Sequence, residues 1–182
     1  MHTRTGNFPI GFRRGWSDWQ KKDLKALAAW AKEAGFSVLD LGAKTTKEDL
    51  AVLKAAGLSV GSVDLLDWPP LLSSDAAKRK DSIAKNTEYI KTLAEAGARR
   101  FFCVIIPEDT AKPRLESHKL AVESYGALAR VCEKAGASIV LEGWPGGGNL
   151  PNLACNPESY RAIFKDTGTQ PGGGLGVNYD PS

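Results

Sequence analysis

The sequence predicts an α/β fold in which parallel strands alternate with outer helices, and three observations support this. The dipeptide Ala-Gly recurs four times between a helix-like stretch and an apolar run, beginning at Ala34, Ala56, Ala96 and Ala135. The runs that follow are short and rich in Val, Ile and Phe, as expected for strands buried on both faces. The alternation of strand and helix continues along the chain, which implies parallel strands with right-handed helical crossovers.

The first half of the chain is predicted to hold three strands and two helices. They are a strand at 8–12, a helix at 18–34, a strand at 36–41, a helix at 46–56 and a strand at 58–66. The two helices begin at candidate capping boxes, formed by Ser17 with Gln20 and by Thr45 with Glu48. Each helix is expected to end at its Ala-Gly pair, because glycine readily adopts the left-handed conformation that terminates a helix.

The second half continues the same pattern. It is predicted to hold helices at 75–96 and 117–135, a further helix that begins at Asn156, and strands at 100–106, 137–141 and 175–179. Asn156 followed by Pro157 is typical of an N-cap with proline at the first helical position. The total is about six strands and five helices without a linker, so residues 1–182 are predicted to form a single domain.

Composition excludes several classes of protein. The 182 residues are 42% hydrophobic, enough for one domain with a core, and 24 Lys and Arg against 21 Asp and Glu give a net charge of +3. This balance is not that of a nucleic-acid-binding polycation. No apolar run approaches the roughly 20 residues that a membrane helix needs, and residues 1–10 lack a signal-peptide core. Three cysteines without a C-x-x-C pair favour a reducing compartment, so we expect a cytoplasmic protein with neither a nucleic-acid nor a membrane partner.

Two parallel architectures fit this order of elements: an open doubly wound sheet and a (β/α)8 barrel. The first strand is followed by Arg-Arg-Gly-Trp at 13–16, which matches neither G-x-G-x-x-G nor a P-loop and so weakens the open-sheet interpretation. A (β/α)8 barrel usually takes about 250 residues. The favoured prediction is therefore an incomplete barrel that lacks strands seven and eight and exposes the edges of strands one and six.

Two carboxylates are the main candidates for chemistry, because barrels carry their active sites at the carboxyl ends of strands. Glu142 closes the apolar run 138–141, where an unpaired carboxylate is costly unless it is hydrogen-bonded, paired or metal-bound. Asp180 follows the strand-like run 176–179, although an aspartate before proline is also a common turn residue. Together, at consecutive strand ends, they offer the hard oxygen ligands that divalent ions prefer.

Three tryptophans and one charged pair are the candidate substrate contacts. Trp144, Trp68 and Trp16 are suited to line a sugar-binding mouth, because sugars offer C–H faces to aromatic rings; packing against helices is an equal alternative for Trp16 and Trp68. Arg13 is suited to hold a phosphate or carboxylate, although a solvated pair with Arg14 is the favoured interpretation. Asp64 is a lesser candidate.

Two other reactive residues are expected to be structural. His118 lies early in a predicted helix and is expected to be solvated or to serve packing. Cys103 lies inside an apolar strand and is expected to be an inert buried thiol.

Two segments resemble a known family. Ile-Val-Leu-Glu-Gly-Trp-Pro-Gly at 139–146 resembles strand five of the xylose-isomerase-like sugar phosphate isomerase/epimerase superfamily, and Gly-Val-Asn-Tyr-Asp-Pro-Ser at 176–182 resembles its strand six. The resemblance implies a TIM barrel with a divalent metal, Mn, Mg, Co or Zn, held by Glu, Asp, His and Glu from strands five to eight. It implies that Glu142 and Asp180 are the first two ligands and that Glu142 is also one of two acid/base residues.

The sequence departs from the family pattern where strands seven and eight would stand. The only histidines are His2 and His118, and neither lies at a predicted strand end, so this chain alone is expected to lack the full site, with its metal position unoccupied. A related DNA-repair endonuclease with a multi-zinc site would need histidines where Asp40 and Asp64 stand.

The resemblance therefore implies a divalent-metal-dependent isomerase or epimerase in carbohydrate metabolism. It would carry out enediolate-type proton transfer on a keto-sugar, as the free sugar or its phosphate, or on a similar hydroxy-carbonyl compound. The alternative is an inactive or partner-completed barrel fragment, and a homo-oligomer is compatible with either function.

Overall fold

A six-stranded parallel sheet organises the computed structural model, which describes residues 8–15, 17–144, 152–170 and 172–180. The strands are paired in the order of the sequence, each with the next. Their bounds are β1 (Gly11–Arg13), β2 (Val38–Leu41), β3 (Ser59–Asp64), β4 (Arg100–Cys103), β5 (Ser138–Glu142) and β6 (Leu175–Asn178). This order without rearrangement is that of a barrel rather than of a doubly wound sheet, so the predicted incomplete TIM-barrel architecture is confirmed.

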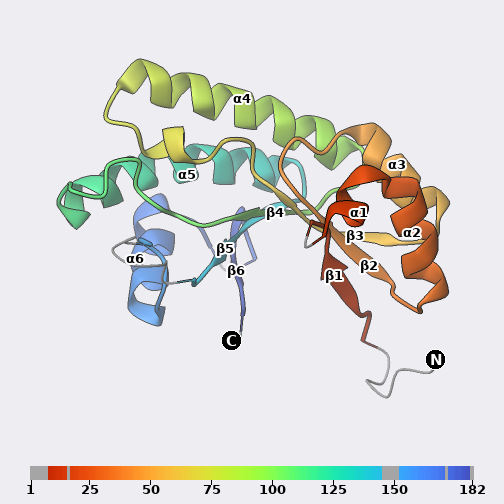
Figure 1. Cartoon of the computed structure of the whole chain (residues 1–182). Coiled ribbons are helices and arrows are strands. Elements are labelled where there is room, and N and C mark those ends of the chain that lie inside the picture. Colours follow the sequence, from red (N-terminus) through yellow and green to blue (C-terminus); the bar gives the residue numbers. More distant parts are fainter. Residues whose placement is uncertain (1–7, 16, 145–151, 171, 181–182) are drawn as a thin grey trace.

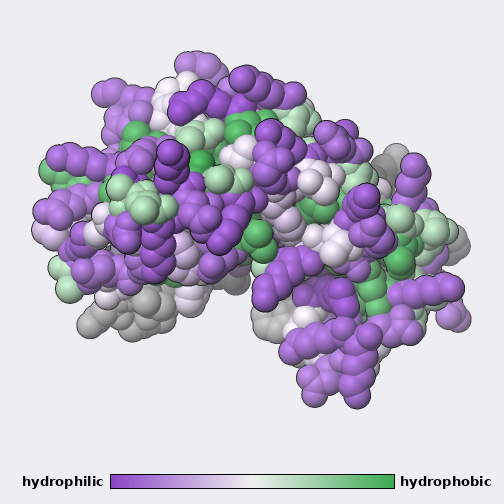
Figure 2. Space-filling view, turned by 90° about the horizontal axis from the view of Figure 1, so that it is seen from above, coloured by the Kyte–Doolittle hydropathy of each residue, from purple (hydrophilic) through white to green (hydrophobic). Residues whose placement is uncertain are grey.

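The helices cover one face of this curved sheet, and no described helix covers the other (Figure 1). They are α1 (Asp18–Lys22), α2 (Leu24–Glu33), α3 (Lys47–Ala55), α4 (Ala76–Glu95), α5 (Arg114–Lys134) and α6 (Pro157–Thr167), with a 3₁₀ turn, η1 (Pro69–Leu72), before α4. None of these helices is long and apolar enough to cross a membrane. The surface over α4 is mostly hydrophilic, with small hydrophobic patches between the hydrophilic residues (Figure 2).

Burial alternates along the strands and defines the two faces of the sheet. On β5, Ile139 and Leu141 are fully buried, whereas Val140 and Glu142 are half-buried. Because successive side chains of a strand point to opposite faces, the buried set packs under the helices and the half-buried set lines the helix-free face. That face corresponds to the interior of a complete barrel. Polar side chains at the carboxyl ends of its strands are therefore the candidates for an active site.

The predicted helix ends are confirmed at all four Ala-Gly pairs. In each pair the alanine is the C-cap and the glycine has a positive φ, between 63° and 111°, at Gly35, Gly57, Gly97 and Gly136. A side chain at such a φ would be strained, so glycine at these positions stops each helix and releases the chain into the next strand.

The helix starts differ from the predictions in several places, and α5 begins at Arg114, three residues before the predicted start at 117. The predicted helix 18–34 is two helices, because Asp23 is extended at φ −141° and its carboxylate caps α2 by accepting from the Ala26 N–H. The predicted box of Thr45 with Glu48 is wrong by one residue, since Thr46 and Asp49 form it. Asn156 caps α6 as predicted, in a box with Ser159, whereas Ser17 makes no side-chain capping bond.

Candidate active site

Charged side chains from four strands gather at the carboxyl end of the helix-free face, which we call the mouth. Arg13 ends β1, Asp40 lies beside it on β2, Asp64 ends β3 and Glu142 ends β5. Arg13 and Asp64 form a hydrogen-bonded ion pair, and the Arg13 guanidinium carbon lies 5.0 Å from the centroid of the Phe102 ring. The parallel register brings these residues together although they are far apart in sequence.

Arg13 is the single described cation among the mouth carboxylates. Its pKa is raised chiefly by the hydrogen bond to Asp64, against an opposing effect of burial, with further contributions from the charges of Asp40 and Glu142. The Asp40 carboxylate accepts a 2.6 Å hydrogen bond from the Ser62 N–H, at the point where the register of β2 and β3 shifts. The sequence favoured a solvated pair of Arg13 with Arg14. This prediction is wrong for Arg13, because its side chain pairs with Asp64, 51 residues away.

Glu142 carries the clearest electrostatic signature of the mouth. Its pKa is raised first by burial, which disfavours the charged form, then by the negative charge of Asp180; Arg13 acts in the opposite direction. Glu142 and Asp180 follow neighbouring strands, β5 and β6, and the charge of Asp180 contributes to the raised pKa of Glu142. A carboxylate with a raised pKa is suited to accept and return a proton.

The backbone at the end of β5 is fixed by two side chains that sequence reasoning missed. Asn152 is 1% exposed, and its Nδ2 donates to the carbonyl oxygens of Glu142, at 2.9 Å, and Trp144, at 2.8 Å. The Tyr160 hydroxyl donates to the Leu141 carbonyl at 3.2 Å. Neither residue ends a strand, and no periodicity marks them, so only the three-dimensional contacts reveal that they hold Glu142 in position.

The three tryptophans do not form one cluster. Trp144 is exposed and lines a cavity of about 490 Å³ between α6 and the end of β6, together with Tyr160, Tyr179 and Asp180. Trp68 is half-buried against the hydrophobic core at the start of η1. Trp16 lies outside the described residues. Only Trp144 is thus described beside a cavity that also contains a candidate ligand.

Other residues singled out from sequence have structural partners. The Arg14 side chain donates to the carbonyl oxygens of Gln20 and Lys21, so it is not a solvated side chain. His118 Nε2 lies 2.8 Å from the Asp166 carboxylate and links α5 to α6. Cys103 is buried 2.9 Å from the Tyr125 hydroxyl, and burial raises its pKa to about 12, so it is inert as predicted.

The two candidate ligands, Glu142 and Asp180, are of a type that binds divalent ions, but two ligands are too few for a complete site. Glu142 and Asp180 supply carboxylate oxygens, and their mutual repulsion would be relieved by a cation between them. Within the described part of the chain, however, no three His, Cys, Asp or Glu side chains are grouped to hold a metal ion. A complete site therefore needs ligands other than those described.

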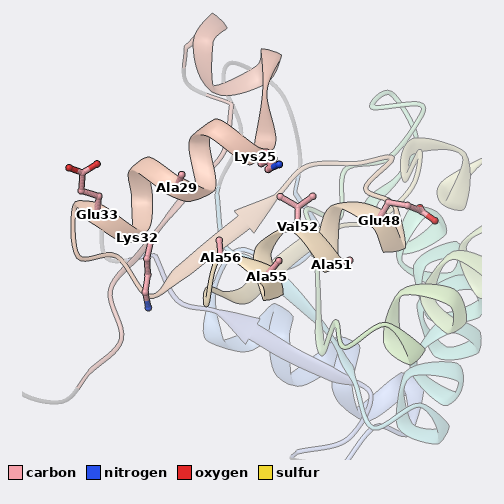
Figure 3. A pocket seen from close by; sticks show the side chains of 9 residues that line it. All are labelled: Lys25, Ala29, Lys32, Glu33, Glu48, Ala51, Val52, Ala55 and Ala56. Atoms are coloured by element: carbon pink, nitrogen blue, oxygen red, sulfur yellow. The ribbon is translucent and has the colours of Figure 1, made fainter.

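A larger cavity lies away from the mouth. It measures about 830 Å³ and lies between α2 and α3 on the outer side of the molecule, lined by short side chains such as Ala29, Ala51 and Ala55 (Figure 3). Alanines on two facing helices leave such a groove because they do not fill the space between them. It contains no strand-end residue, so it is not the candidate active site.

Comparisons with known proteins agree with this architecture. A family model described as a xylose isomerase-like TIM barrel matches residues 8–182. No curated protein matches the sequence. The chain is similar to the solved structure of 3-keto-D-glucoside 4-epimerase from E. coli, with a TM-score of 0.72 and 15% identity over 92% of this chain and 66% of that chain.

Two further solved structures are similar. D-psicose 3-epimerase from Clostridium cellulolyticum H10 has a TM-score of 0.67 and 19% identity, covering 86% of this chain and 59% of its own. A family 2 AP endonuclease from Brucella melitensis has a TM-score of 0.73 and 15% identity, covering 96% and 69%. At these identities the likeness shows the fold alone, and the chain spans less than two thirds of the length of either epimerase.

Proposed function

The chain belongs to the xylose isomerase-like TIM barrel family, and from this premise we propose that its mouth is the active-site half of a divalent-metal-dependent sugar isomerase or epimerase. The proposed reaction moves a proton at the carbon next to the carbonyl of a keto-sugar or similar hydroxy-carbonyl compound. Two of the similar structures are sugar epimerases. The observation that carries the proposal is the raised pKa of Glu142 beside Asp180 at consecutive strand ends.

Three mouth residues, and Trp144 beside the cavity near β6, have roles in this proposal. Glu142 takes the proton from the substrate carbon, because partial burial brings its pKa closer to neutrality than that of a solvated glutamate. Arg13, held by Asp64 and by the Phe102 ring, presents a fixed cation to a substrate oxygen on which negative charge develops. Trp144 offers an aromatic face to the sugar.

The proposed metal is Mn, Mg, Co or Zn, bound by Glu142 and Asp180 with further ligands from strands seven and eight of a complete barrel. When bound, such an ion neutralises charge on adjacent substrate oxygens. The proposed domain is accordingly residues 1–182 as a partial barrel without those two strands.

The test is epimerisation of a panel of free ketoses and ketose phosphates, with and without Mn²⁺, by a protein extended past Ser182. We expect Glu142→Gln to lower the rate by roughly 10²-fold or more, because the amide cannot accept the proton. Glu108→Gln is the matched control, because it makes the same change at a carboxylate that pairs with Lys78 of α4 and is not one of the mouth residues. Absence of divalent-ion binding by the extended protein, or full activity of Glu142→Gln, contradicts the proposal.

A second candidate, a fragment that is inactive until a partner completes the barrel, is favoured by the exposed apolar side chains. Seven large hydrophobic side chains are exposed among the described residues, and six of them lie beside β1 or β6. Phe8 precedes β1, the Trp30 ring contacts Phe12 of β1, and the Trp19 ring contacts Trp30. Trp144, Val177 and Tyr179 line one cavity beside β6, and Leu115 is the seventh. Metal-dependent activity that appears only when a fragment carrying strands seven and eight is added in trans supports this candidate over a self-sufficient enzyme.

A further inference from the structure

Two consecutive arginines at the end of β1 lie in opposite electrostatic surroundings. Arg13 lies in the mouth with Asp40, Asp64 and Glu142. Arg14 instead lines a separate cavity of about 250 Å³ at the carboxyl ends of β1 and β2, together with Lys21 and Lys44. Arg14 directly follows β1, and its N–H donates to the Asp40 carbonyl at 2.9 Å, which extends the pairing of β1 with β2 by one residue. Because adjacent residues of an extended chain point to opposite sides, the basic cavity lies across the end of β1 from the acidic mouth.

The charges of the basic cavity are not neutralised within it. Among the described residues that line it, the one carboxylate is Asp49, which already accepts hydrogen bonds from the backbone N–H of Thr46, at 2.8 Å, and from the Thr46 hydroxyl, at 3.2 Å. Lys21 approaches Asp18 only at 4.0 Å, with both side chains solvated. The cavity therefore offers three cations against one carboxylate that is engaged in capping a helix.

The walls of the cavity are fixed by local hydrogen bonds. The Arg14 guanidinium donates to the carbonyl oxygens of Gln20, at 2.9 Å, and Lys21, at 2.8 Å, which uses two of its five N–H groups. On the opposite wall, the Thr45 hydroxyl donates to the Gly42 carbonyl at 2.7 Å. A guanidinium held in this way loses little side-chain entropy when it binds a ligand.

We propose that the cavity of Arg14, Lys21 and Lys44 binds an oxyanion, either a phosphate ester or a carboxylate. The acidic mouth repels such a group, whereas the basic cavity at the same end of the sheet attracts it. That the oxyanion is the charged end of the substrate, with its carbonyl end in the mouth, rests on the proposed function. Oxyanion binding itself does not.

The experiment is an NMR titration of the 182-residue chain with inorganic phosphate, and separately with acetate, at constant ionic strength set by sodium chloride. We expect saturable shifts of the amide resonances of Gly15, Gly42 and Lys44. The larger response identifies which of the two oxyanions the cavity prefers. Lys21→Gln with Lys44→Gly should weaken binding by about tenfold or more, because two charge-assisted contacts are removed.

The substitutions are chosen to preserve the fold. Lys44 has a φ of 63°, which glycine adopts without strain, and Lys21 is exposed. The control Lys54→Gln with Lys134→Gln removes the same charge from two exposed lysines outside the cavity and should bind phosphate like the parent. If the paired variant does not fold, Lys44→Gly alone should still weaken binding.

Two results overturn the proposal: the Lys21 and Lys44 variant binding as tightly as the control, or shifts equal to those of sodium chloride alone. A parallel Mn²⁺ titration of the protein extended past Ser182 separates it from the proposed function. Phosphate binding by an extended protein that binds no Mn²⁺ upholds the oxyanion site while contradicting the metal-dependent reaction.

Discussion

At the scale of single residues, the Arg13–Asp64 pair is expected to hold the mouth together. Arg13→Met should lower the free energy of unfolding by about 1–2 kcal/mol at pH 7, because it leaves Asp64 close to other carboxylates without a counter-charge. Urea denaturation at pH 7 measures this. Arg161→Met, which removes only an exposed 3.7 Å contact to Glu158, serves as control and should change stability little. An equal loss in both variants would contradict a special role for Arg13.

Glu142 is expected to destabilise the folded protein at neutral pH. Its folded-state pKa is raised, so the folded chain binds the proton more tightly than the unfolded chain. Proton binding to Glu142 therefore stabilises the folded state. This stabilisation is complete below the unfolded pKa, near 4.3, and is lost as pH rises through the raised folded pKa. Glu142→Gln should therefore raise stability at pH 7 by up to about 1 kcal/mol and give no gain at pH 3.5. Thermal unfolding at both pH values tests this; a gain that is independent of pH would contradict it.

The residues that sequence alone could identify are those whose local context is unusual. The desolvation of Glu142 was predictable because this carboxylate ends an apolar strand, and its raised pKa agrees with that prediction. The role of Arg13 was not, because its partner Asp64 comes from a distant strand and nothing in the local sequence encodes that contact. Asn152 was also missed, because its buried amide donates to the carbonyl oxygens of Glu142 and Trp144 and no local sequence pattern indicates these contacts.

At the scale of elements, two predicted helix caps differ in outcome and provide a matched test. Asn156 accepts from the Ser159 N–H at 2.9 Å, so Asn156→Ala should cost about 1 kcal/mol of stability. Ser17 makes no capping bond and its buried hydroxyl has no hydrogen-bond partner in the described structure, so Ser17→Ala should be neutral or slightly stabilising. Chemical denaturation of both variants measures the difference; equal costs would contradict it.

Helix ends were easier to predict than helix starts, for a physical reason. A positive φ after a helix strongly favours glycine, so the Ala-Gly repeat identifies each end almost uniquely. Starts are less distinct, because Ser, Thr, Asp and Asn all cap. Asp23 therefore divides the predicted helix 18–34, and Thr46 replaces Thr45 as the cap.

At the scale of the whole molecule, the order of the strands could be predicted from the alternation of strands and helices in the sequence. Which side chains an open sheet leaves exposed could not. Parallel strands joined by right-handed helical crossovers lie next to one another in sequence order, which is the observed arrangement. The sequence also predicted two open edges. It did not predict that the exposed large hydrophobic side chains would gather there, because exposure depends on which helices cover each strand.

These edges are expected to make the 182-residue chain self-associate. Val177 lies on β6 and is 45% exposed, so Val177→Lys adds a charge to the apolar edge with little loss of packing. Sedimentation velocity over a concentration series should show the parent associating and Val177→Lys shifted toward monomer, with similar melting temperatures. Leu115→Lys, at a 66% exposed site on α5 away from both edges, should associate like the parent, since a non-specific effect of added charge would act equally at either position. A parent that stays monomeric throughout, or equal suppression by both lysines, would show that the open edges do not drive association.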